Sequence, residues 1–251
     1  MPRLTLLIAS LTASGSRRLL LLLLITTITH CATAQRVIDI TNGDVDAAHN
    51  EQMIGLAGGT IFPADKYVKV KEGTPYFYED WCTGSLVLGG GTAYQNLQLK
   101  LDLLNHEVHY KDADNREMIL SAPLKEVILR PGSLDARYFI PGKAWADVDD
   151  KLANTWLEVL INDKVSLLLD IRKKVTETQP YNSSTTEQYI NETNVYFLQK
   201  AGRMNRITKW SELIDLLADK QKQVAKYVKE NNLTGESPLE YADLVAWYNK
   251  L

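Results

Sequence analysis

Short runs in which apolar and polar residues alternate dominate the middle of the chain. The clearest run covers 97–103, where Leu97, Leu99, Leu101 and Leu103 share one face of an extended chain and polar residues share the other. This alternation is typical of a β-strand with one buried and one solvated face. Further runs follow at short spacing, at 84–88, 106–110, 116–120, 125–129, 156–161 and 164–171. The pattern predicts an α+β fold that is mainly β, with an antiparallel meander that forms an open roll or a barrel.

Turn-forming residues separate these runs. Gly89–Gly91 follows the run 84–88, and glycine permits the positive φ that a tight hairpin requires. Asp112–Asn115 also has the composition of a hairpin turn. Pro131–Gly132 and Pro141–Gly142 interrupt the chain before the last Leu-rich hairpin. Successive strands are therefore expected to pair as neighbours.

The pattern changes in the last third of the chain. Residues 176–193 show no apolar periodicity and are expected to form a surface loop, followed by a hairpin at 195–199 and 204–207 that extends the sheet. From Lys209 the apolar spacing becomes helical, with a break near Ala218–Asp219. The last helix is the best defined, because Ser237, Pro238 and Glu240 combine an N-cap, a proline at the first position and a capping box. A C-terminal helical cap that docks on the sheet is expected.

The first 34 residues have the pattern of a secretory signal. Arg17–Arg18 precedes the apolar run 19–25, and Ala32–Ala34 supplies an A-x-A cleavage pattern before Gln35. The apolar run is much shorter than the roughly 18 to 20 residues that a spanning helix needs, so a retained membrane anchor is disfavoured. His30 stands before Cys31, where lipoprotein processing prefers a small residue. We expect cleavage after Ala34 and export to the periplasm or the extracellular space, with or without association with the envelope.

These patterns divide the chain into four parts. They are a signal peptide at 1–34, an antiparallel β domain at 35–175, a loop or linker at 176–193, and a β-hairpin with a helical tail at 194–251 that packs on the β domain. Within the β domain, the lead from 35 to about 64 appears irregular in pattern.

Charge and cysteine content narrow the function classes. The full chain carries 28 basic and 31 acidic residues, and loss of the signal removes three arginines and no acid, which leaves a net charge of −6. Nucleic-acid binding is disfavoured, since it would need a basic surface. Cys82 becomes the remaining cysteine, so no internal disulfide is expected. We interpret Cys82 as a small buried hydrophobic residue; the alternative, a thiol nucleophile, lacks an identifiable base.

Three motifs suggest chemistry without supporting it. His106 and His109 point to opposite faces of a strand, which leaves only Glu107 beside His109 and falls short of the three or four ligands that zinc needs. Asp147–Asp150 with Glu158 resembles the spacing of a calcium loop, but Lys151 and Leu152 occupy positions for an oxygen ligand and a glycine. Gly89–Gly91 lacks the Lys-Ser/Thr of a phosphate-binding loop, and no nucleophile elbow surrounds Ser85. No metal, cofactor or catalytic residue is expected.

An aromatic cluster is the best candidate for a binding surface. Tyr76, Tyr78 and Trp81 lie close together in sequence, and aromatic side chains on a sheet stack on sugars or anchor protein partners. On a strand Phe77 would face away from Tyr76 and Tyr78, so part of this cluster is expected in the core.

Several apolar segments carry a resemblance to known proteins. They are 73–81, 157–160, 164–168, 196–198 and the closing 244–249. In these segments the chain resembles a group of uncharacterised small secreted proteins of Bacteroidota, over roughly 54–251. The resemblance implies a β-rich body, a helical C-terminal tail and a location in a Gram-negative envelope. The group has no assigned activity, so no functional residue carries over.

The sequence leaves three functional hypotheses. The first is a non-enzymatic exported protein that binds another envelope component. The second is a carrier of an apolar, lipid-like ligand in a sheet cavity lined by Leu97, Leu99, Leu101 and Leu103. The third is a hydrolase that uses scattered acidic residues.

Overall fold

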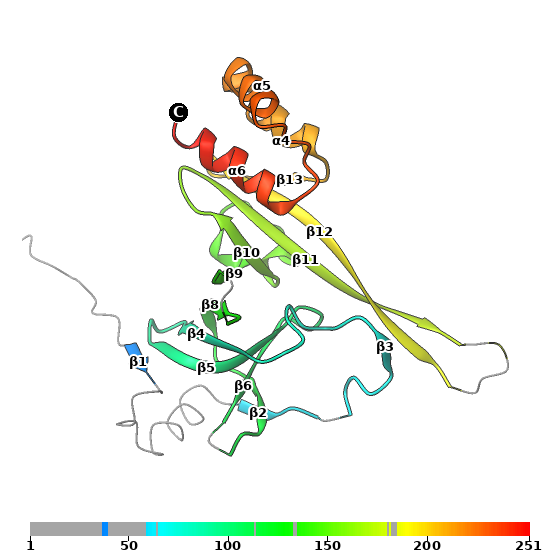
Figure 1. The fold of residues 1–251 in the computed structure, drawn as a ribbon. Helices are drawn as coiled ribbons and strands as arrows, with labels where there is room; N and C mark the ends of the chain where they lie inside the picture. The colour runs from blue at the N-terminus through cyan, green and yellow to red at the C-terminus, as the bar shows by residue number, and fades with distance from the viewer. Residues whose placement is uncertain are drawn as a thin grey trace, which may run out of the picture. The chain divides into compact units, whose positions relative to one another are not determined.

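The chain folds into an open sheet of mainly antiparallel strands, and helices follow the strands (Figure 1). The computed structural model describes residues 37–39, 59–63, 65–112, 114–132, 135–179, 181 and 185–251. All of them belong to one of the chain's two compact units, Arg36–Leu251. The predicted signal at 1–34 lies outside the described residues. The mainly β class with a C-terminal helical cap, predicted from the alternation of apolar residues, is confirmed.

The strands follow one another along the sheet with few crossovers. In chain order they are β1 (Val37–Asp39), β2 (Gly59–Ile61), β3 (Val70–Glu72), β4 (Cys82–Leu88), β5 (Ala93–Asp102), β6 (Glu107–Lys111), β7 (Glu117–Leu120), β8 (Leu124–Arg130), β9 (Arg137–Pro141), β10 (Trp156–Ile161), β11 (Val165–Thr178), β12 (Glu187–Lys200) and β13 (Arg203–Ile207). Their order in the sheet is β13-β12-β11-β10-β9-β8-β4-β5-β6-β7-β2, with β1 parallel to β5 and β3 parallel to β12. Among the described strands β13 and β2 are the ends of this path, so the sheet stays open.

The hairpins form at the predicted turns. Gly91 has a φ of +92° between β4 and β5, and Asn115 has a φ of +62° between β6 and β7. β1 and β2 correct the expectation of an irregular lead over 35–64. Each is only three residues long and pairs with a distant strand, β5 or β7, so its own sequence carries no periodicity.

The hairpin β11–β12 is much longer than the sequence suggested. Its ladder runs without a break from Val165 paired with Lys200 to Thr178 paired with Glu187. The expected surface loop at 176–193 was therefore wrong over most of its length, because strand residues cover 176–178 and 187–193. Side chains on both faces of this part are largely solvated, which removes the contrast between apolar and polar positions that marks a half-buried strand.

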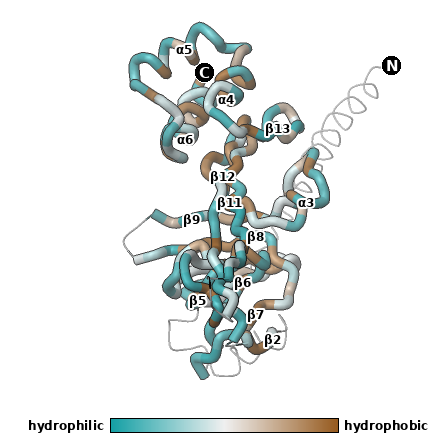
Figure 2. The backbone as a smooth tube through the Cα atoms, turned by 90° about the vertical axis from the view of Figure 1, so that its right-hand side faces the viewer, coloured by the Kyte–Doolittle hydropathy of each residue, from teal (hydrophilic) through white to brown (hydrophobic). Residues whose placement is uncertain are grey.

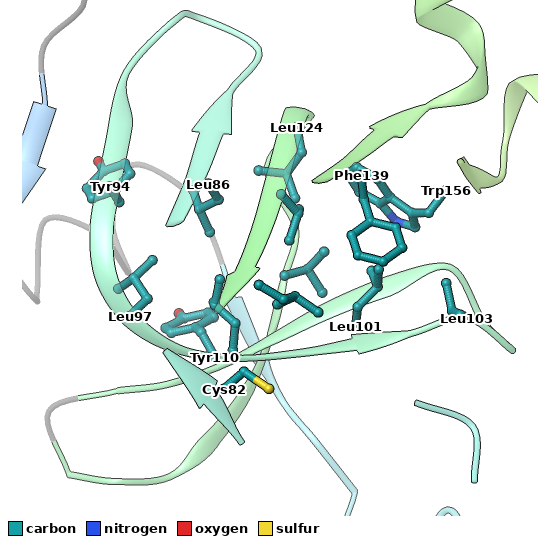
Figure 3. Packing of buried hydrophobic residues seen from close by; sticks show 14 of the residues in the cluster. Cys82, Leu86, Tyr94, Leu97, Leu101, Leu103, Tyr110, Leu124, Phe139 and Trp156 are labelled. Atoms are coloured by element: carbon teal, nitrogen blue, oxygen red, sulfur yellow. The ribbon is translucent and has the colours of Figure 1, made fainter. Parts of the chain in front are cut away.

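The main core is formed by side chains from the strands β4 to β11. Leu99, Leu101 and Tyr110 are at most 1% exposed and pack against Val127, Leu129 and Phe139 from β8 and β9. Figure 3 shows the side chains of this cluster converging from neighbouring strands. Burial of each such side chain contributes about 1.5–3 kcal/mol relative to exposure. The four leucines of 97–103 are thus all buried in this core, as the alternation predicted.

The helices cover one face of the sheet at β11, β12 and β13. They are α4 (Trp210–Leu216), the 3-10 turn η2 (Ala218–Lys220), α5 (Gln221–Glu230) and α6 (Pro238–Tyr248). The break near Ala218 and the Ser237–Glu240 capping box form as predicted. Leu213, Leu217 and Leu244 are fully buried against Leu167 of β11 and Leu198 of β12. None of the helices among the described residues is long and apolar enough to cross a bilayer.

Asn249 attaches the end of α6 to the start of β11. Its Oδ1 accepts the backbone N–H of Val165 at 2.9 Å, and its Nδ2 donates to the backbone oxygen of Val165 at 2.8 Å. Both bonds are buried, and Asn249 is 8% exposed. The amide thus takes the place of a neighbouring strand at the first residue of the long hairpin.

Candidate functional site

A cleft of about 1020 Å³ opens on the other face of β11–β13. Its floor includes Phe197 of β12, Met204 of β13 and Leu152 of the short helix α3 (Asp150–Ala153). Leu103 and His106 line it from the turn between β5 and β6. In Figure 2, α3 and α6 lie on opposite sides of β11 and β12, so the cleft and the helical layer use different faces. The cleft is concave and partly apolar, the usual setting of a binding site.

Two acidic residues of the cleft accept hydrogen bonds from backbone N–H groups that form its wall. Asp149 is the N-cap of α3, because its Oδ1 accepts the backbone N–H of Leu152 at 2.7 Å. Asp147 Oδ2 accepts the backbone N–H of Met204 at 3.2 Å, which ties this wall to β13. Asp149 is thus used for capping and Asp147 for contact with β13, and Glu158 of β10 pairs with Arg137 of β9.

The basic side chains of the cleft are only partly neutralised. Arg172 pairs with the buried carboxylate of Asp170 at 2.6 Å, and Lys173 pairs with Glu192 at 2.7 Å. Among the described residues, Lys151 and Arg206 have no anionic partner. Four basic and three acidic side chains line the cleft, and Lys151 and Arg206 are the two basic ones that form no ion pair with a described residue.

His106 adds a titratable group at the rim of the cleft. Exclusion of water from the ring lowers the pKa of His106, and the negative charges of Asp170 and Asp102 oppose this shift. At neutral pH the imidazole is then mainly uncharged and provides one donor and one acceptor.

A second polar group lies at the base of the same β5–β6 turn. Asp102 and Glu107 face each other across the two strands, and His109 follows Glu107 on the same face of β6. Asp102 is 0% exposed and accepts the backbone N–H groups of Leu104 and Asn105, each at 2.9 Å. We call Asp102, Glu107, His109 and the neighbouring Glu117 the His109 cluster.

The His109 ring is enclosed by a carboxylate and by aromatic side chains. It is 0% exposed, and its Nδ1 lies 2.7 Å from Oε1 of Glu117 on β7. Phe62 and Tyr76 pack beside it with ring centroids at 4.9 and 5.5 Å. Glu107, in contrast, reaches the edge of the cluster and pairs with Lys66 Nζ at 2.7 Å. Burial and the charges of nearby carboxylates raise the pKa of Tyr76 above its ordinary value, so its hydroxyl stays protonated.

The aromatic residues predicted to bind a partner are distributed over three environments. Tyr76 is 7% exposed and faces the His109 cluster, while Tyr78 is half-buried against the main core. Trp81 is half-buried between two lysines, with the ammonium groups of Lys100 and Lys111 5.2 and 5.1 Å from its ring. The segment 77–80 bends instead of forming a strand, so the alternation assumed for these residues was wrong. The structure does not bring the three into one exposed face.

Cys82 occupies the start of β4 within the main core. It is 5% exposed, and burial, with a smaller effect of the Asp80 charge, raises the pKa of its thiol. A raised thiol pKa disfavours the reactive thiolate at neutral pH. The environment is that of the small buried hydrophobic residue expected from the sequence.

Sequence reasoning missed the basic residues of the cleft. Lys151, Arg172 and Arg206 come from three separate segments, and no short motif joins them. The pairing of Asp102 with Glu107 had a weaker signal, because the two residues lie at the facing ends of two successive predicted strands, 97–103 and 106–110. Glu107 and His109 were expected side by side, and they are: Oε2 of Glu107 lies 3.6 Å from Nε2 of His109.

Comparison of the chain with protein-family models, with curated proteins and with solved structures finds no match in any of the three. The arguments on function therefore rest on the residues and their geometry.

Proposed function

We propose that this chain is an exported, non-enzymatic binding protein, and that its cleft holds an extended acidic segment of a partner protein. The observation that carries the proposal is the position of Lys151 and Arg206, which lie without anionic partners among the described residues over the apolar floor of the cleft. Charged groups of a partner would pair with these side chains, while its apolar groups would contact Phe197 and Met204.

The outer edge of β13 beyond Met204, whose N–H Asp147 already accepts, favours an extended partner. β13 ends the path of paired strands, and the backbone N–H of Met204 points outward to Asp147. Backbone groups alternate in direction along a strand, so those of Arg206 also face outward, away from β12. An added strand would pair with them, as in the β-augmentation that other peptide-binding domains use.

The two other functional hypotheses have less support. Each of the three cleft carboxylates, Asp147, Asp149 and Asp170, already accepts a bond from the protein, which leaves a hydrolase without an evident base. Leu97, Leu99 and Leu101 pack in the filled core, and only Leu103 of the four leucines also lines the cleft. A purely apolar cargo would also leave Lys151 and Arg206 unused.

The test uses a synthetic peptide of alternating glutamate and valine, capped at both ends and carrying a fluorophore. Fluorescence anisotropy should show saturable binding to the purified chain that weakens with salt. Arg206→Glu and Lys151→Glu should each weaken binding about fivefold or more, because a charge that attracts the peptide becomes one that repels it. Lys125→Glu, an exposed basic position on β8, is the matched control and should leave binding unchanged.

Two further peptides separate the contributions. The same peptide with alternate backbone nitrogens methylated should bind more weakly, because it cannot pair with the edge of β13. A lysine–valine peptide should not compete. Equal binding of the acidic and basic peptides, or indifference to Arg206→Glu, would contradict the proposal. Displacement of the acidic peptide by a long-chain fatty acid at equal concentration would instead favour the lipid-carrier hypothesis.

Export is a separate part of the proposal and rests on the pattern of residues 1–34. The protein recovered from an envelope or culture fraction should begin at Gln35, as measured by intact mass. A bulky charged residue at the cleavage position, Ala34→Arg, should leave the signal attached. Recovery of the unprocessed chain from the cytoplasm alone would contradict this part.

A further inference from the structure

Three potential metal ligands converge at the base of the β5–β6 turn. Asp102, Glu107 and His109 each offer one ligand atom, and these atoms all lie within 4.8 Å of one another. The register explains the convergence: Asp102 and Glu107 are direct partners across the hairpin, and His109 is two residues further along the same face. The cluster is set by strand geometry and not by a flexible loop.

The buried imidazole has one nitrogen without a partner. Nδ1 of His109 lies 2.7 Å from the Glu117 carboxylate, so Nδ1–H donates to it in the neutral ring. Nε2 then carries the lone pair, and among the described residues it has no hydrogen-bond partner although His109 is 0% exposed. An unpartnered buried polar atom destabilises a fold, so the position of this nitrogen next to two carboxylates calls for a physical reason.

We propose that Asp102, Glu107 and His109 bind one divalent transition-metal ion, with Zn²⁺ as the best chemical fit. One imidazole nitrogen and two carboxylate oxygens form a ligand set that zinc accepts, and three protein ligands leave a fourth position for water. Glu117 completes the arrangement: a carboxylate that accepts the second ring N–H orients the histidine and makes Nε2 a better ligand. Mg²⁺ and Ca²⁺ prefer sites built from oxygen alone and would compete poorly.

Lys66 would compete with a metal ion for the carboxylate of Glu107. Its ammonium lies 2.7 Å from Oε2 of Glu107, the oxygen nearest to His109 Nε2, and it also lies over the rings of Phe62 and Tyr67 at 5.7 and 5.6 Å. A metal ion at the site would displace this ammonium from Glu107. Removal of the Lys66 charge should therefore strengthen metal binding. If the Lys66–Glu107 pair served only the fold, the same change would lower stability and leave metal binding unchanged.

The site is separate from the cleft but shares one turn with it. Leu103 and His106 line the cleft, while Asp102 and Glu107 flank the same turn at its base. The proposal does not rest on peptide binding, and its test contains no peptide.

The experiment titrates the purified chain, freed of metal with a chelator, with Zn²⁺ by isothermal calorimetry. We expect one equivalent to bind and the thermal midpoint to rise with zinc. Glu107→Gln should weaken binding about a hundredfold by loss of a ligand, and Glu117→Gln about 10- to 100-fold by loss of the supporting carboxylate. Lys66→Met should strengthen binding about tenfold, since a like charge is removed near the ion. Glu126→Gln on β8 is the matched control and should bind as the unaltered chain does.

The outcomes separate a metal site from a structural network. Glu107 is partly exposed, so Glu107→Gln is expected to fold, and circular dichroism checks that it does. Its result therefore stands even where His109→Ala, a change at a buried residue, fails to fold. The absorption spectrum of bound Co²⁺ gives a second measurement, and loss of its visible bands in Glu107→Gln would support the assignment. Absence of stoichiometric zinc binding in both the unaltered chain and Lys66→Met would overturn the proposal. Zinc binding that Glu107→Gln leaves unchanged would overturn it as well.

Discussion

The two halves of the β11–β12 hairpin share one ladder of backbone hydrogen bonds but lie in different surroundings. In β11 the residues from Val165 to Ile171 are all buried, whereas those from Arg172 to Thr178 are mostly exposed. The register continues across this boundary without a shift. We call 165–171 with 194–200 the proximal half, and 172–178 with 187–193 the distal half.

The comparison shows that backbone pairing forms the strands in both halves, whereas packing of apolar side chains stabilises the proximal half. The proximal half packs Leu167 and Leu198 against the helices on one face and Leu168 and Phe197 against α3 on the other. The distal half has β3 beside it and surface pairs such as Glu187 with Lys71 of β3 at 2.6 Å. Such exposed pairs contribute little to stability. The cleft lies at the boundary between the buried proximal half and the exposed distal half, at Asp170 and Arg172.

The largest expected effect is at Leu167, which is fully buried under the helices. Leu167→Ala should lower the free energy of unfolding by about 3 kcal/mol, through lost burial and a residual cavity. Val175→Ala, a half-buried position in the distal half, should cost only about 1 kcal/mol. Urea denaturation of both variants measures the difference. Equal losses would show that the two halves are stabilised alike.

The second prediction compares two asparagines. Asn249→Ala should cost about 2 kcal/mol, because it leaves the buried N–H and carbonyl of Val165 without partners. Asn191→Ala breaks only an exposed bond to Thr176 at 2.9 Å and should change stability by less than about 0.5 kcal/mol. Thermal unfolding followed by circular dichroism provides the comparison. A loss at position 191 as large as that at 249 would contradict the proposed contrast in burial.

The third prediction concerns the contact between the distal half and the segment after β3. Gly73 has a φ of +83°, and a Cβ there would lie 2.1 Å from the backbone oxygen of Ile190. Gly73→Ala should therefore separate β3 from β12 and cost about 1 kcal/mol or more. Hydrogen exchange should quicken at 70–72 and 188–190 while the proximal amides stay protected. Gly90→Ala, where a Cβ meets nothing within 4 Å, is the control and should leave exchange unchanged.

The smallest expected effect is a pH dependence. Hydrogen bonds from Lys200 and Tyr248 lower the pKa of Asp219 beside the proximal half, and a bond from Lys71 lowers that of Glu187 in the distal half. A lowered carboxyl pKa stabilises the fold above the unfolded pKa of about 4, and this contribution disappears as the pH falls through the lowered value. The difference in urea midpoint between the unaltered chain and Asp219→Asn should thus shrink below about pH 4. Glu187→Gln should show a smaller difference, since its partner Lys71 is 59% exposed whereas Lys200, the partner of Asp219, is 26% exposed.

The proximal half could be predicted from the sequence, and the distal half could not. Trp156–Ile161 and Lys164–Ile171 form a dense apolar pair of strands, whose burial leaves a clear pattern. Residues 176–178 and 187–193 are strand residues that are largely solvated on both faces, and their composition of Thr, Glu, Gln and Asn is also that of a loop. What holds them extended is pairing with a partner strand, which a local pattern does not encode.

The same distinction applies to the candidate sites. Glu107 and His109 could be placed side by side because they lie two residues apart on one strand. Asp102 joins them through the register of β5 with β6, and Glu117 through β7. The basic residues of the cleft come from segments that meet only in the folded chain. Sites formed by register between strands are therefore less visible in a sequence than those formed within one strand.

The bond between Asn249 and Val165 also orders events in time. The two residues are 84 positions apart, so a chain synthesised at roughly 5–20 residues per second makes Val165 several seconds before its partner exists. The strands β4 to β8 have their neighbours within a short stretch of chain and can close early. The buried N–H and carbonyl of Val165 therefore gain this partner only once α6 has been made.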